Sequence, residues 1–151
     1  MSNYSPEVLR TLVNGGWQEG RVVDTKSIEY FVKSEGFAWF PEVEAFLTEF
    51  AGLSFVWTGS SGFDSDFRFD AVLSVENFDT YWILQHYRSR IPKHTAFCPI
   101  GVLSGTHMQL FMDSETCFYG GYDDILVFFG KGAAEFFQNL CSPPDPARQM
   151  E

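Results

Sequence analysis

The 151-residue sequence has few basic residues, because only 10 lysines and arginines accompany 20 aspartates and glutamates. The formal net charge is −10 at pH 7. No lysine or arginine lies between Lys33 and Arg68, or between Lys93 and Lys131. An acidic chain repels nucleic acid and anionic lipid and attracts basic partners. The composition therefore argues against nucleic-acid and membrane binding. It leaves two interpretations of the acidic residues, a solvated surface that aids solubility or a docking face for a basic protein.

Cysteine is also scarce, with residues only at positions 98, 117 and 141. The odd number and the absence of a Cys-x-x-Cys pair argue against a disulfide framework and a zinc site. The first ten residues lack the basic and apolar regions of a signal peptide. No stretch approaches the roughly 18 apolar residues of a membrane-spanning helix. We therefore expect a cytoplasmic protein with reduced thiols and no membrane partner.

The glycine-rich stretch NGGWQEGRVVD (14–24) does not meet the requirements of a phosphate loop. Gly15 and Gly20 have the first spacing of that motif, but Arg21 stands where its lysine is required. The stretch also follows a predicted helix, whereas the motif follows a strand. We interpret it as a structural corner in which Gly15 takes the left-handed position that ends a helix. Arg21 and Asp24 are close enough to pair or to cap the next helix.

No metal or catalytic signature is complete. Asp64, Asp66 and Asp70 have the spacing of a calcium loop but lack its glycine and its final glutamate. Neither a zinc-protease nor a serine-hydrolase motif occurs. We therefore expect no catalytic residue, no cofactor and no metal. A small enzyme remains an alternative, because residues distant in sequence can converge. It would use Cys98 or one of the histidines, which are His86, His94 and His107.

Apolar residues are plentiful at 45%, and aromatics reach 18%, which is enough to build the core of one domain. Helical periodicity predicts helices at 5–14, 26–35, 41–51, 77–91 and 132–141. Alternation predicts strands at 53–58, 66–73, 95–101, 107–113 and 115–120, with 125–129 as a further candidate. This order predicts an α+β fold with N-terminal helices, a mainly antiparallel central sheet of about five to six strands and a C-terminal helix. We expect one domain over 1–142 and a flexible tail over 143–151.

Four stretches, in this order, resemble the SUKH-3 immunity-protein family of the SUKH superfamily. They are GWQEGRVVD (16–24), FPEVEAFLTEFAGLSF (40–55), CPIG (98–101) and LFMDSETCFYG (110–120). The sequence departs from the family at a few positions. Ala51 stands where glycine is more usual, and Thr116 and Cys117 replace Gly-Arg type residues at a hairpin turn. The likeness covers about residues 8 to 141.

The resemblance implies a SUKH-like fold and a bacterial cytoplasmic immunity protein that binds and neutralises a cognate polymorphic toxin by occluding it. Such toxins are often nucleases or deaminases, and the family implies no catalytic residues. The acidic bias indicates in addition that the toxin is basic. Opposite charges on the two proteins would mainly raise the association rate. A non-catalytic SUKH-like adaptor or regulatory protein-binding module is the alternative. Nothing in the sequence supports a homo-oligomer, although so many rings allow one.

Two segments mix aromatic and acidic residues, as protein-binding surfaces often do. They are the loop and strand around 57–70 and the loop at 119–124. The candidate partner-binding residues are Trp57, Phe63, Asp64, Asp66, Tyr119, Tyr122, Asp123 and Asp124. Ordinary polar loops with partly buried rings would give the same pattern, so both interpretations stay open.

Overall fold

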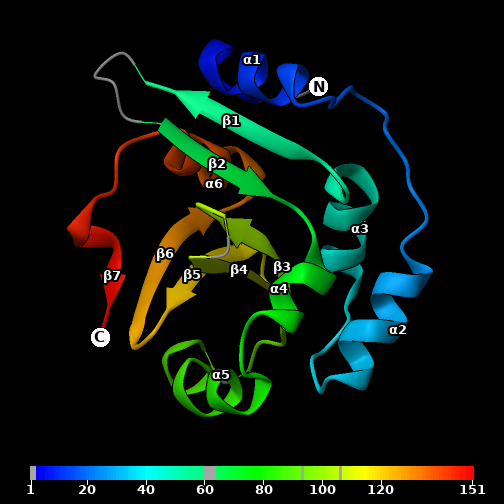
Figure 1. Cartoon of the computed structure of the whole chain (residues 1–151), viewed down its shortest axis with the longest axis vertical. Helices are drawn as coiled ribbons and strands as arrows, with labels where there is room; N and C mark the ends of the chain where they lie inside the picture. Colours follow the sequence, from blue (N-terminus) through cyan, green and yellow to red (C-terminus); the bar gives the residue numbers. More distant parts are fainter. Residues whose placement is uncertain (1–2, 60–63, 93, 106) are drawn as a thin grey trace.

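A computed structural model describes residues 3–59, 64–92, 94–105 and 107–151. Helices lead into an antiparallel sheet (Figure 1). The helices are α1 (Pro6–Asn14), α2 (Lys26–Ser34), α3 (Pro41–Phe50), α4 (Ala71–Glu76), α5 (Thr80–His86) and α6 (Ala133–Leu140), with 3-10 turns η1 (Arg88–Arg90) and η2 (Pro146–Arg148). The strands are β1 (Ser54–Thr58), β2 (Asp64–Arg68), β3 (Phe97–Leu103), β4 (Met108–Asp113), β5 (Cys117–Tyr122), β6 (Ile125–Lys131) and β7 (Gln149–Met150).

The described strands form one sheet in chain order, from β1 to β7, and every neighbouring pair is antiparallel. The predicted α+β class, the antiparallel sheet and the helices at both ends are therefore confirmed. The sheet has seven strands, slightly more than expected. The additional strand, β7, lies within 143–151 and pairs with β6 over two residue pairs.

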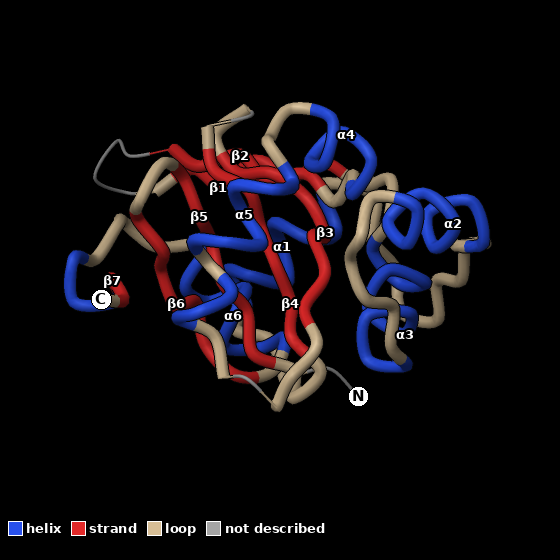
Figure 2. The backbone as a smooth tube through the Cα atoms, turned by 90° about the horizontal axis from the view of Figure 1, so that it is seen from below, coloured by secondary structure: helices blue, strands red, loops and turns tan. Residues whose placement is uncertain are grey.

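Aromatic rings fill the core between one face of the sheet and helices α3 and α6. The ring of Phe46 on α3 lies 5.1 Å from that of Phe69 and 5.2 Å from that of Phe118, measured between centroids. Phe118 in turn stacks on Phe136 of α6 at 4.1 Å. Ring pairs at these distances add to the stabilisation that burial provides. α2 and α3 lie together at one flank of the sheet (Figure 2).

Helix α1 begins as predicted, since the Ser5 side chain accepts a hydrogen bond from the backbone N–H of Val8. Its end differs from the prediction. Gly15 has an ordinary φ of −83°, and Gly16 is the left-handed residue with φ +103°. Gly15 is required for another reason, because a Cβ there would lie 2.2 Å from a ring carbon of Phe55.

The corner at 14–24 is structural, as interpreted. Arg21 donates from Nη1 to the Glu49 carbonyl at 2.7 Å and from Nη2 to the Ala51 carbonyl at 2.9 Å. It therefore binds carbonyls at the end of α3, which have no partner within that helix. Trp17 is buried and donates to the Glu49 carboxylate at 2.8 Å. Asp24 accepts from the N–H of Lys26.

The strand predicted over 66–73 is wrong in its second half. β2 ends at Arg68, and Asp70 is the N-cap of α4, where its carboxylate accepts from the Leu73 N–H at 2.9 Å. Apolar residues at 67, 69, 71 and 73 suit a strand, but they also suit the end of a strand followed by a short helix. The capping hydrogen bond of an aspartate stabilises the helical alternative.

The helix predicted over 77–91 starts later and ends earlier. Asn77 follows the end of α4, and the carboxylate of Asp79 caps α5 by accepting from the Trp82 N–H at 3.1 Å. α5 ends at His86 and gives way to η1. The segment is therefore one short helix and a 3-10 turn, and Tyr87 between them donates from its hydroxyl to the Asp123 carbonyl beyond the end of β5.

Candidate partner-binding groove

The eight candidate residues do not form one exposed patch. Trp57 is only 5% exposed and Tyr119 only 2%. The indole of Trp57 hydrogen-bonds the Glu7 carboxylate, and the Tyr119 hydroxyl donates to Asp113 at 2.8 Å. Phe63 lies outside the described residues. The two covered rings are not available to a partner in this conformation.

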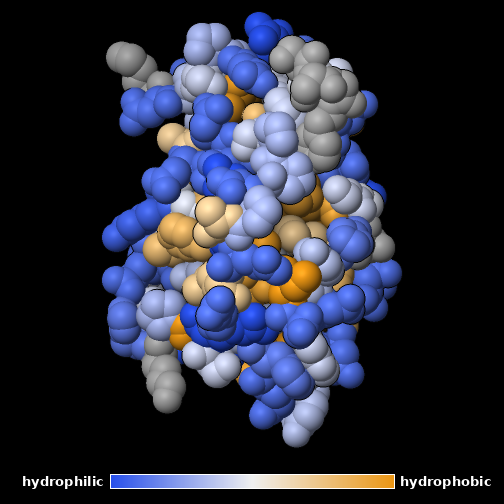
Figure 3. All heavy atoms as spheres, turned by 90° about the vertical axis from the view of Figure 1, so that its left-hand side faces the viewer, coloured by the Kyte–Doolittle hydropathy of each residue, from blue (hydrophilic) through white to orange (hydrophobic). Residues whose placement is uncertain are grey.

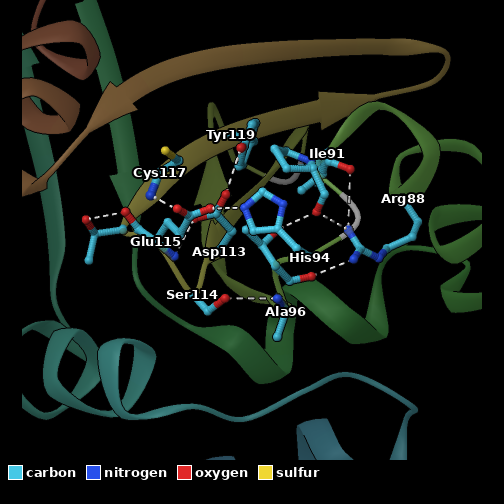
Figure 4. Close-up of polar contacts among 12 residues, drawn as sticks. Arg88, Ile91, His94, Ala96, Asp113, Ser114, Glu115, Cys117 and Tyr119 are labelled. Carbon is cyan, nitrogen blue, oxygen red and sulfur yellow. Dashed lines mark hydrogen bonds and ion pairs between the residues drawn. The ribbon is translucent and has the colours of Figure 1, made fainter.

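Tyr119 belongs to a buried network at the β4–β5 turn (Figure 4). The carboxylate of Asp113, which is 1% exposed, accepts from Tyr119 and from the N–H groups of Glu115 and Cys117 at 2.9 and 3.0 Å. Burial, followed by the hydrogen bond to this carboxylate, holds the pKa of Tyr119 well above its usual range. His94 contacts the Glu115 carboxylate at 2.6 Å on the outside of the turn. These bonds fix the turn in place.

Asp64 and Asp66 are exposed on β2. The carboxylate of Asp66 accepts from the Gly105 N–H at 3.0 Å, and its carbonyl accepts from the Ser104 N–H at 2.8 Å. Asp66 is thereby joined to the β3–β4 turn. Asp64 is the first residue of β2 and lies opposite Thr58 of β1.

Tyr122, Asp123 and Asp124 come together at an open groove of about 590 Å³. The groove lies between the α4–α5 region and the turn that joins β5 to β6. We call it the acidic groove, and its lining residues are Asn77, Phe78, Asp79, Trp82, Ile83, Tyr87, His107, Tyr122, Asp123 and Asp124.

The wall of the acidic groove is held by contacts from α5 and η1. Tyr87 is buried and donates from its hydroxyl to the Asp123 carbonyl at 2.8 Å. Arg90 donates to the Asp124 carbonyl at 2.9 Å. Gly121 allows this approach, because a Cβ there would lie 2.6 Å from the Tyr87 ring. Burial raises the pKa of Tyr87 to about 12, with the charges of Asp123 and Asp124 adding to the rise and Arg90 opposing it.

Rings line much of the groove. Trp82 stacks on His86 with centroids 4.1 Å apart, and the His107 ring lies 4.6 Å from that of Tyr122. Trp82 and Tyr122 are half-buried, so part of each ring is accessible. Ring faces of this kind attract cations.

Carboxylates surround these rings. Asp79, Asp123 and Asp124 are all exposed, and only Asp79 uses a carboxylate oxygen in a capping bond. Carboxylates and aromatic faces together suit a lysine or arginine side chain, which can form ion pairs and cation–π contacts at once. The arrangement can therefore receive a basic segment.

The sequence prediction includes three of the ten lining residues, Tyr122, Asp123 and Asp124. It does not include Asp79 and Trp82, because a continuous helix from residue 77 gives no indication that these side chains face the β5–β6 turn. The capping aspartate at 79 was the signal that could have divided the helix.

The candidates for an enzyme site are dispersed. Cys98 is fully buried, and burial holds the pKa of its thiol far above the usual range, whereas reactive cysteines have a lowered pKa. His86, His94 and His107 each contact a different neighbour. In the part of the chain that the structure describes, no three His, Cys, Asp or Glu side chains are grouped to hold a metal ion.

The described residues define an α+β domain with an open groove lined by rings and carboxylates. The sequence model of the SUKH-3 immunity protein family matches residues 4–143, nearly the whole chain. The chain belongs to this family, which confirms the resemblance and supports a general immunity role. Immunity proteins of this kind are generally non-catalytic. No curated protein and no solved structure matches the chain. None of the described helices combines the length and the apolar character that crossing a membrane requires.

Proposed function

We propose that the protein binds a cognate bacterial toxin and neutralises it by occlusion, and that the acidic groove receives a basic segment of that toxin. Membership of an immunity-protein family supports the general role. The observation that carries the finer proposal is the gathering of Asp79, Asp123 and Asp124 around accessible rings.

The chemistry of the groove favours a toxin that acts on nucleic acid, such as a nuclease or a deaminase. Such enzymes bind phosphates through lysine and arginine side chains. Carboxylates at the groove present negative charge to the same side chains. When the toxin binds the groove through those side chains, this protein covers the substrate-binding surface of the toxin. The block is steric and needs no catalytic step. We infer that the complex forms in the bacterial cytoplasm, where nucleic acid is the target.

Co-expression tests the role directly. Toxin domains encoded beside the gene are expressed with and without this protein, and growth is scored. We expect growth to be restored for at least one toxin. Failure against every adjacent toxin would contradict the proposal and favour an adaptor instead.

Charge reversal tests the groove. Asp124→Lys should weaken binding of the rescued toxin by at least about tenfold, because a like charge then faces the basic segment. Glu35→Lys is the matched control, since Glu35 is exposed at the end of α2 and does not line the groove. Calorimetry measures both affinities. Equal weakening by the two variants would refute the assignment of the groove.

A further inference from the structure

A second cavity, of about 290 Å³, lies beneath residues 143–151, which we call the strap. The strap crosses it with Pro144, Pro146 and Gln149. The cavity is walled mainly by apolar side chains of the sheet and α6, among them Leu103, Met108, Ile125, Val127, Phe129 and Leu140. Figure 3 views the side of the molecule that carries β6 and β7, and apolar residues gather at its centre between hydrophilic ones.

Few interactions hold the strap in place. β6 has seven residues, but β7 pairs only with Leu126 and Val127, through Met150 and Gln149 respectively. Most strap residues are exposed, and the family match ends at residue 143. A segment paired over two residues opens at little cost compared with the central strands.

The cavity suits apolar side chains better than a small molecule. Its volume is at the lower limit of small-ligand sites, which run from about 300 to 1,000 Å³. Two of its polar groups are already engaged, because Asn139 donates to the Phe129 carbonyl at 2.6 Å and Ser142 donates to the Asn139 carbonyl at 2.8 Å. The lining therefore offers mainly shape and apolar surface.

The cavity also borders the acidic groove. Tyr122, at the end of β5, lines both. A protein that placed a basic side chain in the groove could extend a neighbouring segment along β6 and past the cavity.

We propose that the strap is a replaceable strand: an extended segment of the toxin pairs with β6 in its place and inserts an apolar side chain into the cavity. Strand addition of this kind gains affinity from main-chain hydrogen bonds and specificity from the side-chain pocket. The inference rests on the proposed function, because the occupant is part of the toxin. The strap shields the cavity until the toxin arrives.

A disulfide lock tests the exchange in the full chain. Val127 and Gln149 oppose each other across β6 and β7, and cross-strand Cβ atoms lie close to the separation that a disulfide needs. Toxin binding by the variant Val127→Cys/Gln149→Cys is measured in its oxidised and in its reduced form. Peptide mass mapping verifies that the disulfide has formed. The probe is the toxin domain that passes the rescue test. We expect oxidation to weaken its binding at least about tenfold, because the strap cannot leave. The single variant Gln149→Cys, treated in the same way, controls for effects of oxidation other than the disulfide.

Loosening the strap should act in the opposite direction. Met150 is half-buried and packs on the core, whereas Ala147 is exposed, does not line the cavity and does not pair with β6. Met150→Asp should therefore release the strap and tighten toxin binding by up to about tenfold, while Ala147→Asp adds the same charge with little effect. Hydrogen exchange at β6 should then show protection by the toxin in both variants.

The outcomes separate the two proposals. Toxin binding that is equal in the oxidised and reduced forms would overturn the replaceable strand and leave the proposed function intact. Dimerisation of Met150→Asp on size exclusion would identify a second copy as the occupant, and binding of an apolar dye with unchanged toxin affinity would identify a small ligand. Either result overturns the assignment to the toxin. A toxin that binds neither form nor the unaltered chain would overturn both proposals.

Discussion

Arg21 joins two segments that are distant in sequence. Its guanidinium donates to the carbonyls of Glu49 and Ala51, where α3 ends and the chain turns into β1. Gly52 follows with φ +85°, so the turn depends on both residues. A planar cation with several donors suits this position, because it can satisfy two carbonyls at once.

Replacing this guanidinium should lower stability without changing the fold. We expect Arg21→Ala to reduce the free energy of unfolding by about 2 kcal/mol, since it removes two charged hydrogen bonds to helix-terminal carbonyls. Arg21→Lys should recover only part, because an ammonium lacks the planar fork. Urea denaturation measures both. Arg10→Ala, an exposed position on α1, is the control and should change stability by less than about 0.5 kcal/mol.

Tyr87 should make the folded protein sensitive to alkaline pH. Burial raises its pKa to about 12, from a usual value of about 10. The stability that the neutral phenol contributes is complete below about pH 10, and it is lost as pH rises toward 12, because the unfolded chain releases the proton first. Tyr87→Phe should therefore flatten the fall in unfolding free energy between about pH 10 and 12. Tyr30→Phe, at a 79% exposed position, should retain the slope of the unaltered protein.

Among the elements, β7 differs most from its neighbours. β4 and β5 are paired on both sides within the sheet, whereas β7 has one neighbour and two residue pairs. Flexibility of 143–151 remains a prediction. We expect the amides of Gln149 and Met150 to exchange with solvent at least about 100-fold faster than those of Leu110 and Met112. Hydrogen exchange followed by mass spectrometry or NMR measures the ratio. Comparable protection would contradict both this flexibility and the ready release that the replaceable strand requires.

The strength of local sequence signals explains how much of the fold the sequence could predict. α1, α3 and the β4–β5 hairpin carry strong local signals, namely capping residues, regular periodicity and a short polar turn, and all three were placed correctly. The segment 66–79 was not, because alternating apolar residues fit both a strand and a strand followed by a helix. The carboxylates of Asp70 and Asp79 resolve this ambiguity through capping bonds with Leu73 and Trp82.

At the scale of the molecule, the site was harder to predict than the fold. The acidic groove combines residues 77–87 with residues 107 and 122–124. The sequence indicates that Asp123 and Asp124 lie in a turn, but the groove exists because Tyr87 binds that turn from η1 and α5. Trp57 and Tyr119 show the converse, since aromatic residues beside acidic ones proved to be core. Burial of a ring depends on packing between distant elements, which local pattern does not contain.

Placement of the charge, more than its total, should govern association with the toxin. Asp123→Asn/Asp124→Asn and Glu35→Gln/Glu44→Gln each remove two charges, so both change the formal net charge from −10 to −8. Asparagine also tolerates the positive φ of Asp123, and glutamine at 44 can still accept from Trp39.

Charges near the contact steer the encounter more strongly than distant ones, and salt weakens this steering. We therefore expect the groove variant to slow association more than the control pair does, by about tenfold at low salt. Its rate should also depend less on salt. Stopped-flow measurements from about 20 to 200 mM salt test this. If the two variants slow association equally, the steering comes from the net charge of the molecule, and the acidic groove has no special part in it.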